Sequence, residues 1–368
     1  MRADYVMIGG FLGAGKTTAV LALAQTLTAR GRRVGLITND QSVGLVDTAL
    51  AATGGFPVEE ITGGCFCCRF TSLTAAAERL QERTAPDVFI AEPVGSCTDL
   101  RASVSYPLRR LYGEAYRVAP LSVLVDPIRA LRLFGLEPGR AFSPRVQYVY
   151  EKQLEEADLI VVNKVDLIDA ARRERLREAL AARFPQAEIL EASARQGSGL
   201  PEWFSRIFDT ELRLSDTPDM DYDIYADGEA RLGWYNATIR VTSGGASDGN
   251  ALVMALATAI QQRLGGADVE IAHCKMTLTA KEMGDDMAAL NLVRSDGTAE
   301  LSHRLRDPLD AGELLLNLRA EARPDTLRNA VQDAIAGAGH AGGWQLHIVH
   351  AEAFSPTRPT PTYRMTTA

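Results

Sequence analysis

Residues Gly10–Thr17 read GFLGAGKT and match the pattern G-x-x-x-x-G-K-[ST]. An apolar run, Tyr5–Ile8, precedes them, and a helical pattern over Lys16–Ala29 follows. A strand, a glycine-rich loop and a helix in this order are typical of a P-loop. Glycines let backbone N–H groups point at phosphates, and the helix N-terminus favours negative charge. The stretch predicts a nucleotide site; a glycine-rich turn without a ligand is the alternative.

The pattern gives each position of the loop an expected role. Lys16 should reach the β- and γ-phosphates of a nucleoside triphosphate, and the Thr17 hydroxyl should ligate Mg²⁺. Both are therefore candidate catalytic residues as well as ligand-binding ones. The remaining residues of the loop should contact the phosphates through the backbone; they are Gly10, Gly13, Ala14, Gly15 and Thr18.

Short apolar runs alternate with helical patterns through the first part of the chain. This alternation predicts right-handed βαβ units, and therefore an α/β fold in which a parallel sheet carries helices on both faces. We expect a P-loop NTPase domain over residues 1–212, with ligands at the carboxyl ends of its strands. The expected strands are Tyr5–Ile8, Val34–Thr38, Asp87–Ala91, Leu121–Val125, Leu159–Val162 and Glu188–Leu190.

The pattern changes after residue 212. Residues 213–232 are rich in Asp without a clear period, so we expect a linker there. Residues 233–354 follow the order βαββαβ, which predicts a smaller ferredoxin-like α+β domain. Its middle strands are separated by an insertion at 280–309, where we expect a helical turn and a hairpin. The tail, 355–368, contains three prolines and should be extended or disordered.

A second nucleotide motif follows the strand Leu159–Val162, where Asn163–Asp166 reads NKVD. Asn-Lys-x-Asp is the guanine-reading signature of GTPases. The Asp166 carboxylate can accept two hydrogen bonds from guanine, whereas adenine would leave it unpaired. Lys164 would lie along the base and Asn163 would brace the loop. The motif therefore predicts GTP as the nucleotide; a helix-capping role for Asp166 is the alternative.

Further candidate nucleotide contacts lie after other strands. Ser193-Ala194 could offer a backbone contact to the guanine oxygen. Glu92 ends a strand and is a candidate for catalysis and for holding Mg²⁺, and Gly95 could donate its backbone N–H to the γ-phosphate. Three more acids follow strands, and each is a candidate for the Mg²⁺ site or for a simple capping role; they are Asp40, Asp47 and Asp126.

Three of the five cysteines are crowded into Gly63–Cys68, which reads GGCFCC. This crowding is unlike a disulfide framework, and thiolates are ligands for Zn²⁺, Cu(I) or related soft ions. Cys68 begins a helical pattern whose positive end should lower the pKa of its thiol. We predict a metal site at Cys65, Cys67 and Cys68; small buried side chains are the alternative. The fourth ligand is not assigned, because all five histidines lie at or beyond His273.

The composition narrows the classes of function. The chain has 368 residues and a net charge of −8, which disfavours binding to nucleic acid. No apolar run is long enough to span a bilayer, and the N-terminus lacks the pattern of a signal peptide. We therefore expect a cytoplasmic protein without nucleic-acid or membrane partners. The sequence leaves its oligomeric state open.

Together these motifs resemble the CobW-like P-loop GTPases, whose hallmark is the Cys-x-Cys-Cys element. The resemblance covers roughly the first 210 residues. It implies GTP hydrolysis with Mg²⁺, coupled to metal delivery or to assembly of a client metalloenzyme or cobalamin-dependent enzyme, with Zn²⁺ or Co²⁺ at the cysteines. The matching pieces are Gly10–Thr18, Asn39–Asp47, Gly63–Cys68, Glu92–Gly95, Asp126 and Gln153–Asp166.

The chain also departs from that family. Asn39–Val43 reads NDQSV where the family commonly has Asn-Glu-Phe-Gly-Glu, so Val43 removes a carboxylate, and a His-rich stretch is absent. These departures favour a specialised client over metal storage. The leading hypothesis is a slow GTPase that acts as a metallochaperone or metalloenzyme-maturation factor. The second is a GTP-controlled regulator or conformational chaperone that carries no metal, and the third, a P-loop kinase or ATPase, is opposed by NKVD.

Overall fold

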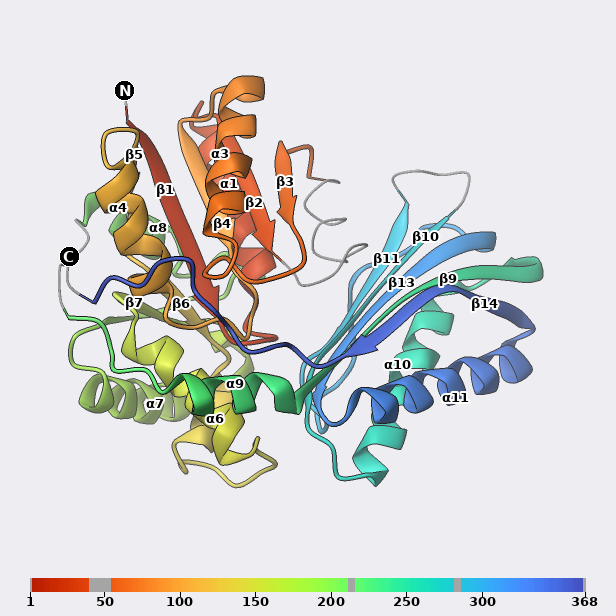
Figure 1. The fold of residues 1–368 in the computed structure, drawn as a ribbon. Helices are drawn as coiled ribbons and strands as arrows, with labels where there is room; N and C mark the ends of the chain where they lie inside the picture. Colours follow the sequence, from red (N-terminus) through yellow and green to blue (C-terminus); the bar gives the residue numbers. More distant parts are fainter. Residues whose placement is uncertain (1, 40–53, 211–215, 281–285, 367–368) are drawn as a thin grey trace. The chain divides into compact units, whose positions relative to one another are not determined.

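The structure, a computed structural model, describes residues 2–39, 54–210, 216–280 and 286–366 (Figure 1). The chain divides into two compact units at Tyr225/Ala226 and again at Thr357/Arg358. The second unit is therefore an insertion within the first unit, to which the chain returns at Arg358. The sequence-based boundaries, with a linker at 213–232 and a separate tail from 355, differ from this division.

The first unit is built on a parallel sheet, as the alternation of patterns predicts. Its strands run in the order β3-β2-β4-β1-β6-β7-β8, and β5 pairs with the start of β1. The strands β2, β4, β6 and β7 are buried along their whole length, which is typical of a sheet covered on both faces. Their bounds are β1 Ala3–Gly10, β2 Val34–Asn39, β3 Val58–Ile61, β4 Val88–Glu92, β5 Tyr116–Val118, β6 Ser122–Val125, β7 Leu159–Val162 and β8 Glu188–Glu191.

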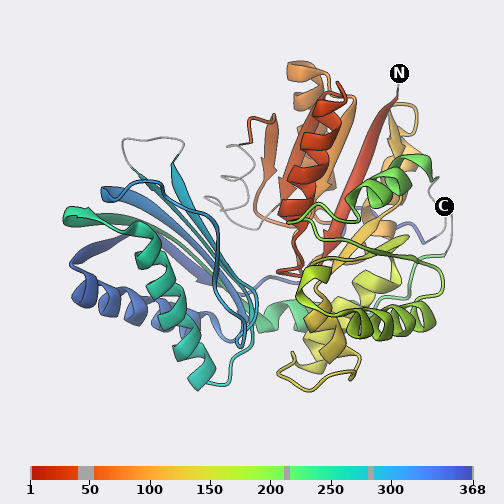
Figure 2. The ribbon, with the colours of Figure 1, turned by 180° about the vertical axis from the view of Figure 1, so that it is seen from behind.

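Helices cover both faces of this sheet. The helices α1 and α8 pack with the strands in one apolar core, and Figures 1 and 2 show α3 on the opposite face from α1. The helical segments are α1 Lys16–Ala29, α3 Phe70–Thr84, the π-helix Arg101–Ser105, α4 Tyr106–Tyr112, α5 Pro127–Leu133, α6 Pro144–Glu155, the 3₁₀ turn Val165–Leu167, α7 Ala170–Arg183, α8 Leu200–Asp209 and α9 Tyr222–Arg231.

The second unit is an antiparallel sheet with two helices packed against it. Its strands run in the order β12-β11-β10-β13-β9-β14, and α10 and α11 share one apolar core with the sheet. The expected insertion supplies β11 and β12, which enlarge the sheet to six strands. The bounds are β9 Leu232–Ser247, α10 Gly249–Gly266, β10 Ile271–Ala280, β11 Met287–Leu292, β12 Glu300–His303, β13 Leu309–Glu321, α11 Pro324–Gly342 and β14 Trp344–Phe354.

Two segments differ from the sequence-based expectation. The expected linker contains α9, whose Tyr225 side chain is fully buried and anchors an otherwise polar helix. The tail is extended, as its prolines predict, but residues 358–366 are hydrogen-bonded to the first unit, so the alternative of disorder does not apply to them. These contacts join parts of the chain that are distant in sequence, and no local pattern encodes them.

Candidate nucleotide and metal site

The glycines of the loop between β1 and α1 are required by its backbone. Gly10, Gly13 and Gly15 all have positive φ, at 130°, 79° and 94°. A Cβ atom on Gly10 would lie 2.4 Å from the carbonyl oxygen of Leu124, and one on Gly15 would lie 2.4 Å from Nδ2 of Asn163. Only glycine fits these positions without a shift of the neighbours, so the loop keeps the curled path that turns N–H groups inward.

Lys16 and Thr17 stand at the first turn of α1, and both side chains are buried. The Lys16 ammonium donates to the carbonyl oxygens of Gly10 at 2.9 Å and Phe11 at 3.4 Å. The Thr17 hydroxyl donates to Oε1 of Glu92 at 2.9 Å. The structure therefore brings together the hydroxyl and the carboxylate that the sequence assigns to Mg²⁺, a donor set of hard oxygens that suits this ion.

The NKVD loop is tied directly to the P-loop. Nδ2 of Asn163 donates to the carbonyl oxygen of Ala14 at 2.8 Å, and Oδ1 accepts from the backbone N–H of Ala194 at 2.9 Å. The Lys164 ammonium donates to the carbonyl oxygen of Gly13 at 2.5 Å. Asn163 thus connects the P-loop, the loop after β7 and the loop after β8. Asp166 is exposed beside this junction, where its carboxylate is accessible to a base.

The other acidic candidates are placed differently. Asp126 is buried; Oδ1 accepts from the backbone N–H of Arg129 at 3.0 Å, which caps α5, and Oδ2 accepts from Lys164 at 3.0 Å. The capping alternative is therefore what the structure shows for Asp126. Asp40 and Asp47 lie outside the described residues.

The loop after β4 packs against the P-loop and is hydrogen-bonded to a side chain of α6. A Cβ atom on Gly95 would lie 2.8 Å from Cδ2 and 3.0 Å from the backbone nitrogen of Leu12. The buried Gln153 amide donates to the carbonyl oxygens of Gly95 at 2.9 Å and Cys97 at 2.7 Å. A movement of Gly95 must therefore be accompanied by a change at Leu12 or at Gln153.

The three crowded cysteines form one cluster before α3. The Sγ atoms of Cys65 and Cys67 are 2.7 Å apart, and Cys68 Sγ lies 3.4 Å from the first and 3.7 Å from the second. The N–H groups of Cys68 and Arg69 both donate to the carbonyl oxygen of Cys65, and this turn folds the three thiols onto one another. The cluster is a group that could hold a metal ion.

The pKa values of the three thiols are shifted in different directions, and only that of Cys65 is lowered. Hydrogen bonds from the thiols of Cys67 and then Cys68 hold the pKa of Cys65 well below its usual range. The hydrogen bond with Cys65 raises the pKa of Cys68 to about 11 and raises that of Cys67 well above its usual range, and burial adds to both shifts. The expectation that the helix end lowers the pKa of Cys68 is thus wrong, because its neighbour carries the charge instead.

The C-terminal segment, residues 358–366, lies against this cluster. The Thr360 N–H donates to Sγ of Cys68 at 3.2 Å. The Thr362 N–H and hydroxyl donate to the carbonyl oxygens of Cys67 at 2.9 Å and Cys68 at 3.2 Å. Sequence reasoning missed these contacts, because nearly 300 residues separate the partners and the segment contains no motif.

In the part of the chain that the structure describes, no helix has both the length and the apolar character needed to cross a membrane.

The P-loop, the NKVD loop and the thiol cluster together define a P-loop nucleotide-binding protein with a candidate metal site. Residues 4–191, just over half of the chain, match the CobW/HypB/UreG nucleotide-binding domain. The chain therefore belongs to this family, and the resemblance stated from the motifs is confirmed.

Two curated relatives show how far the similarity reaches. The zinc chaperone CobW of Sinorhizobium sp is 30% identical over 198 residues, which cover 48% of this chain and 55% of that protein. The zinc chaperone YeiR of Escherichia coli K12 is 36% identical over 163 residues, which cover 44% and 46%. The chain thus spans about half the length of these relatives.

Solved structures that match include HypB from Helicobacter pylori in complex with nickel, at 18% identity and a TM-score of 0.42, covering 56% of this chain and 86% of that one. The Zn(II)-bound YjiA GTPase from E. coli matches at 15% identity and a TM-score of 0.35, covering 91% and 99%.

Proposed function

We propose that this protein binds and hydrolyses GTP and uses the nucleotide state to hold and release a metal ion, as a CobW-like zinc chaperone. The observation that carries the proposal is the cluster of Cys65, Cys67 and Cys68, whose Sγ atoms lie within 3.7 Å of one another in the same unit as a P-loop. The names of the curated relatives favour zinc as the ion.

The phosphates are assigned to the loop between β1 and α1. Its N–H groups surround them, and Lys16 exchanges the neutral carbonyls of Gly10 and Phe11 for the β- and γ-phosphate oxygens. Thr17 and Glu92 already lie in contact and would hold Mg²⁺, which when bound offsets the charge that develops on the phosphates. The backbone N–H of Gly95 is assigned to the γ-phosphate.

The guanine base is assigned to the NKVD loop. Asp166 accepts hydrogen bonds from its N1–H and its exocyclic amine, and the stem of Lys164 covers one face of the ring. The bond from Lys164 to Gly13 and the two bonds of Asn163 support this assignment, since they fix the loop beside the phosphates. Ser193-Ala194, joined to Asn163, is assigned to the guanine oxygen.

Zinc is the cargo of this site rather than a resident cofactor. Three thiols on one turn suit a soft divalent ion, and only Cys65 is predisposed to carry charge before it arrives. Binding would therefore release protons from Cys67 and Cys68, so the affinity should rise with pH. We infer that the ion is passed to a client metalloenzyme.

The test is equilibrium binding of Zn²⁺, by competition with a chromophoric chelator, in the presence of a non-hydrolysable GTP analogue. A variant with Cys65, Cys67 and Cys68 all changed to Ser should lose affinity by orders of magnitude. Cys274→Ala is the matched control, because this buried cysteine lies in the second unit and should leave the affinity unchanged. Equal affinities in all three proteins would overturn the metal assignment and favour the metal-free regulator.

A further inference from the structure

A fourth cysteine lies against the cluster, although it is distant in sequence. Cys97 is buried, with only 1% of its surface exposed, and its thiol is in hydrogen-bond contact with the thiols of Cys65 and Cys67. Cys97 stands in the loop after β4, on a different strand end from the turn that holds the other three. Two segments that are separate in sequence thus meet at their sulfur atoms.

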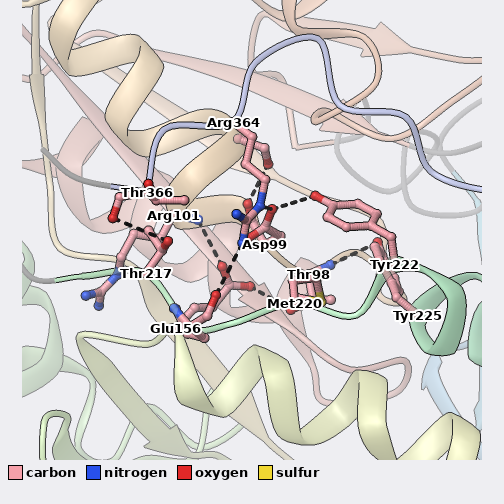
Figure 3. A network of polar contacts seen from close by, with 12 residues as sticks. Thr98, Asp99, Arg101, Glu156, Thr217, Met220, Tyr222, Tyr225, Arg364 and Thr366 are labelled. Atoms are coloured by element: carbon pink, nitrogen blue, oxygen red, sulfur yellow. Dashed lines mark hydrogen bonds and ion pairs between the residues drawn. The ribbon is translucent and has the colours of Figure 1, made fainter.

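The backbone around Cys97 is fixed by buried polar groups. Its own N–H donates to the carbonyl oxygen of Val94 at 2.9 Å, and its carbonyl oxygen accepts from Gln153 at 2.7 Å. The next residue, Thr98, donates through its backbone to the hydroxyl of Tyr225 at 3.2 Å and through its side chain to Glu156 at 3.0 Å (Figure 3). The backbone that carries the Cys97 thiol is therefore held on both sides of this residue.

Asp99 extends this support to the C-terminal segment. Its backbone has a positive φ of 62°, and its carboxylate accepts from the hydroxyl of Tyr222 at 2.6 Å and from Nε of Arg364 at 2.9 Å (Figure 3). The same segment donates the Thr360 N–H to Cys68. Residues 358–366 therefore contact both segments that carry the cysteines, one at Cys68 and the other at Asp99.

We propose that Cys97 is a fourth thiolate ligand, so that Cys65, Cys67, Cys68 and Cys97 form an all-sulfur site for Zn²⁺. This inference rests on the proposed function, which assigns three cysteine ligands, and it adds the fourth. In a tetrahedral zinc–thiolate site the sulfur atoms are about 3.8 Å apart, given zinc–sulfur bonds of about 2.3 Å. Two of the measured separations, 3.4 and 3.7 Å, are already close to this spacing, and the third, 2.7 Å, must widen by about 1 Å.

The surroundings suit the negative charge of such a site. Four thiolates around Zn²⁺ carry a net charge of −2, and the cluster precedes the N-terminus of α3, a helix of 15 residues whose positive end faces it. The Thr360 N–H supplies a hydrogen bond to one sulfur, as outer groups around metal sites commonly do. Cys97 is not among the ligand atoms that already lie within 4.8 Å of one another, so its thiol must move closer to at least one of the other three sulfurs when the ion binds.

The position of Cys97 connects the metal to the nucleotide. Gly95, assigned to the γ-phosphate, is two residues away, and one side chain, Gln153, holds the carbonyl oxygens of both residues. When Gly95 moves towards or away from a γ-phosphate, Cys97 is displaced with it. The fourth zinc–sulfur bond is then the one that responds to hydrolysis, while the turn from Cys65 to Cys68 keeps the other three.

The test is X-ray absorption at the zinc edge on the full chain loaded with one equivalent of Zn²⁺. We expect four sulfur neighbours in the wild type, and three sulfurs with one oxygen or nitrogen in Cys97→Ala. The affinity of this variant should fall at least ~10-fold, because losing a direct ligand costs no less than losing an outer one. The difference in Zn²⁺ affinity between the GTP-analogue and GDP forms should also shrink in Cys97→Ala. Cys274→Ala should match the wild type in every measurement.

The outcomes separate the two proposals. Three sulfurs and one lighter atom in the wild type would overturn the role of Cys97 and leave the proposed zinc function standing. Failure of the wild type to bind Zn²⁺ would overturn both. Unchanged binding of a fluorescent GTP analogue would show that Cys97→Ala is folded. If the variant does not fold, the wild-type spectrum alone still decides how many sulfur atoms bind the zinc.

Discussion

Replacing Glu156 by glutamine should remove a large pH dependence of stability from the first unit. Glu156 is 1% exposed, and its carboxyl oxygens accept from the Thr98 hydroxyl at 3.0 Å and the Arg101 N–H at 2.9 Å. Burial, reinforced by the charge of Asp99, raises its pKa to about 8. The Arg101 guanidinium lowers the pKa of Glu156 only slightly, because it is already paired with Asp158 at 2.7 Å.

The sign of the effect follows from the raised pKa. Below pH 4.5, the ordinary pKa of the group, Glu156 is protonated in both folded and unfolded chains. Between pH 4.5 and about 8 the unfolded chain loses this proton and the folded one keeps it, so stability falls as pH rises. The full loss is roughly 5 kcal/mol, since each unit of pKa corresponds to about 1.4 kcal/mol.

Glutamine keeps the shape of the neutral acid. Its amide oxygen can accept from Arg101 and its amide nitrogen can donate to Thr98. The free energy of unfolding, followed by fluorescence of Trp203 with Trp234 and Trp344 changed to Phe, should therefore show wild type losing stability relative to Glu156→Gln from pH 5 to pH 8. A difference that stays constant over this range would mean that Glu156 is ionised in the folded protein.

Glu155→Gln provides the matched control. Its carboxylate is 37% exposed and pairs with Lys152 at 2.6 Å on the surface of α6. Neutralising it should change stability by less than about 1 kcal/mol at any pH, as is usual for exposed ion pairs. A pH-dependent difference as large as that of Glu156→Gln would show that the assay reports general charge effects rather than one buried carboxyl.

Three further changes test the site. Gly15→Ala places a methyl group 2.4 Å from Asn163 Nδ2 in a backbone with positive φ, so binding of a fluorescent GTP analogue should fall at least ~10-fold; unchanged affinity would contradict the loop geometry. Asp166→Asn should weaken GTP and admit xanthosine triphosphate in the same titration, and a variant that still prefers GTP would refute base reading by Asp166. Deleting the residues after Pro359 removes the hydrogen bond from Thr360 to Cys68. Alkylation of the Cys68 thiol, followed by mass spectrometry, should then become several-fold faster. An unchanged rate would show that the segment does not shield the thiol.

Local patterns predicted the first unit well. The alternation of apolar runs and helical patterns encodes a parallel sheet, and the strands at Val34 and Leu159 begin where expected, because each is an apolar run between polar turns. The short strands β3 and β5 were missed, since three or four residues with partly exposed side chains leave little pattern. In the second unit, the hairpin expected within residues 280–309 is present as β11 and β12, but the sequence pattern did not show that it would extend the main sheet through β10.

The parts of the site that the sequence did not reveal depend on tertiary contacts. Cys97 follows Cys68 by 29 positions and fits no spacing rule for metal ligands, so only the fold shows that the two segments meet. Lys164 offered no sign that it would pair with Asp126, because that pairing requires two strand ends to be adjacent. The pKa order within the cysteines likewise depends on which thiol receives hydrogen bonds from the other two.

The return of the chain to its first unit at Arg358 also sets an order of events during synthesis. A ribosome that has completed the P-loop and the cysteine turn must still translate residues 69–357, including the whole second unit, before it reaches the residues that lie against Cys67 and Cys68. At about 5–20 residues per second, this interval lasts roughly 14–58 s. During that time the nascent protein presents its thiols uncovered, so the first encounter with metal can precede the finished fold.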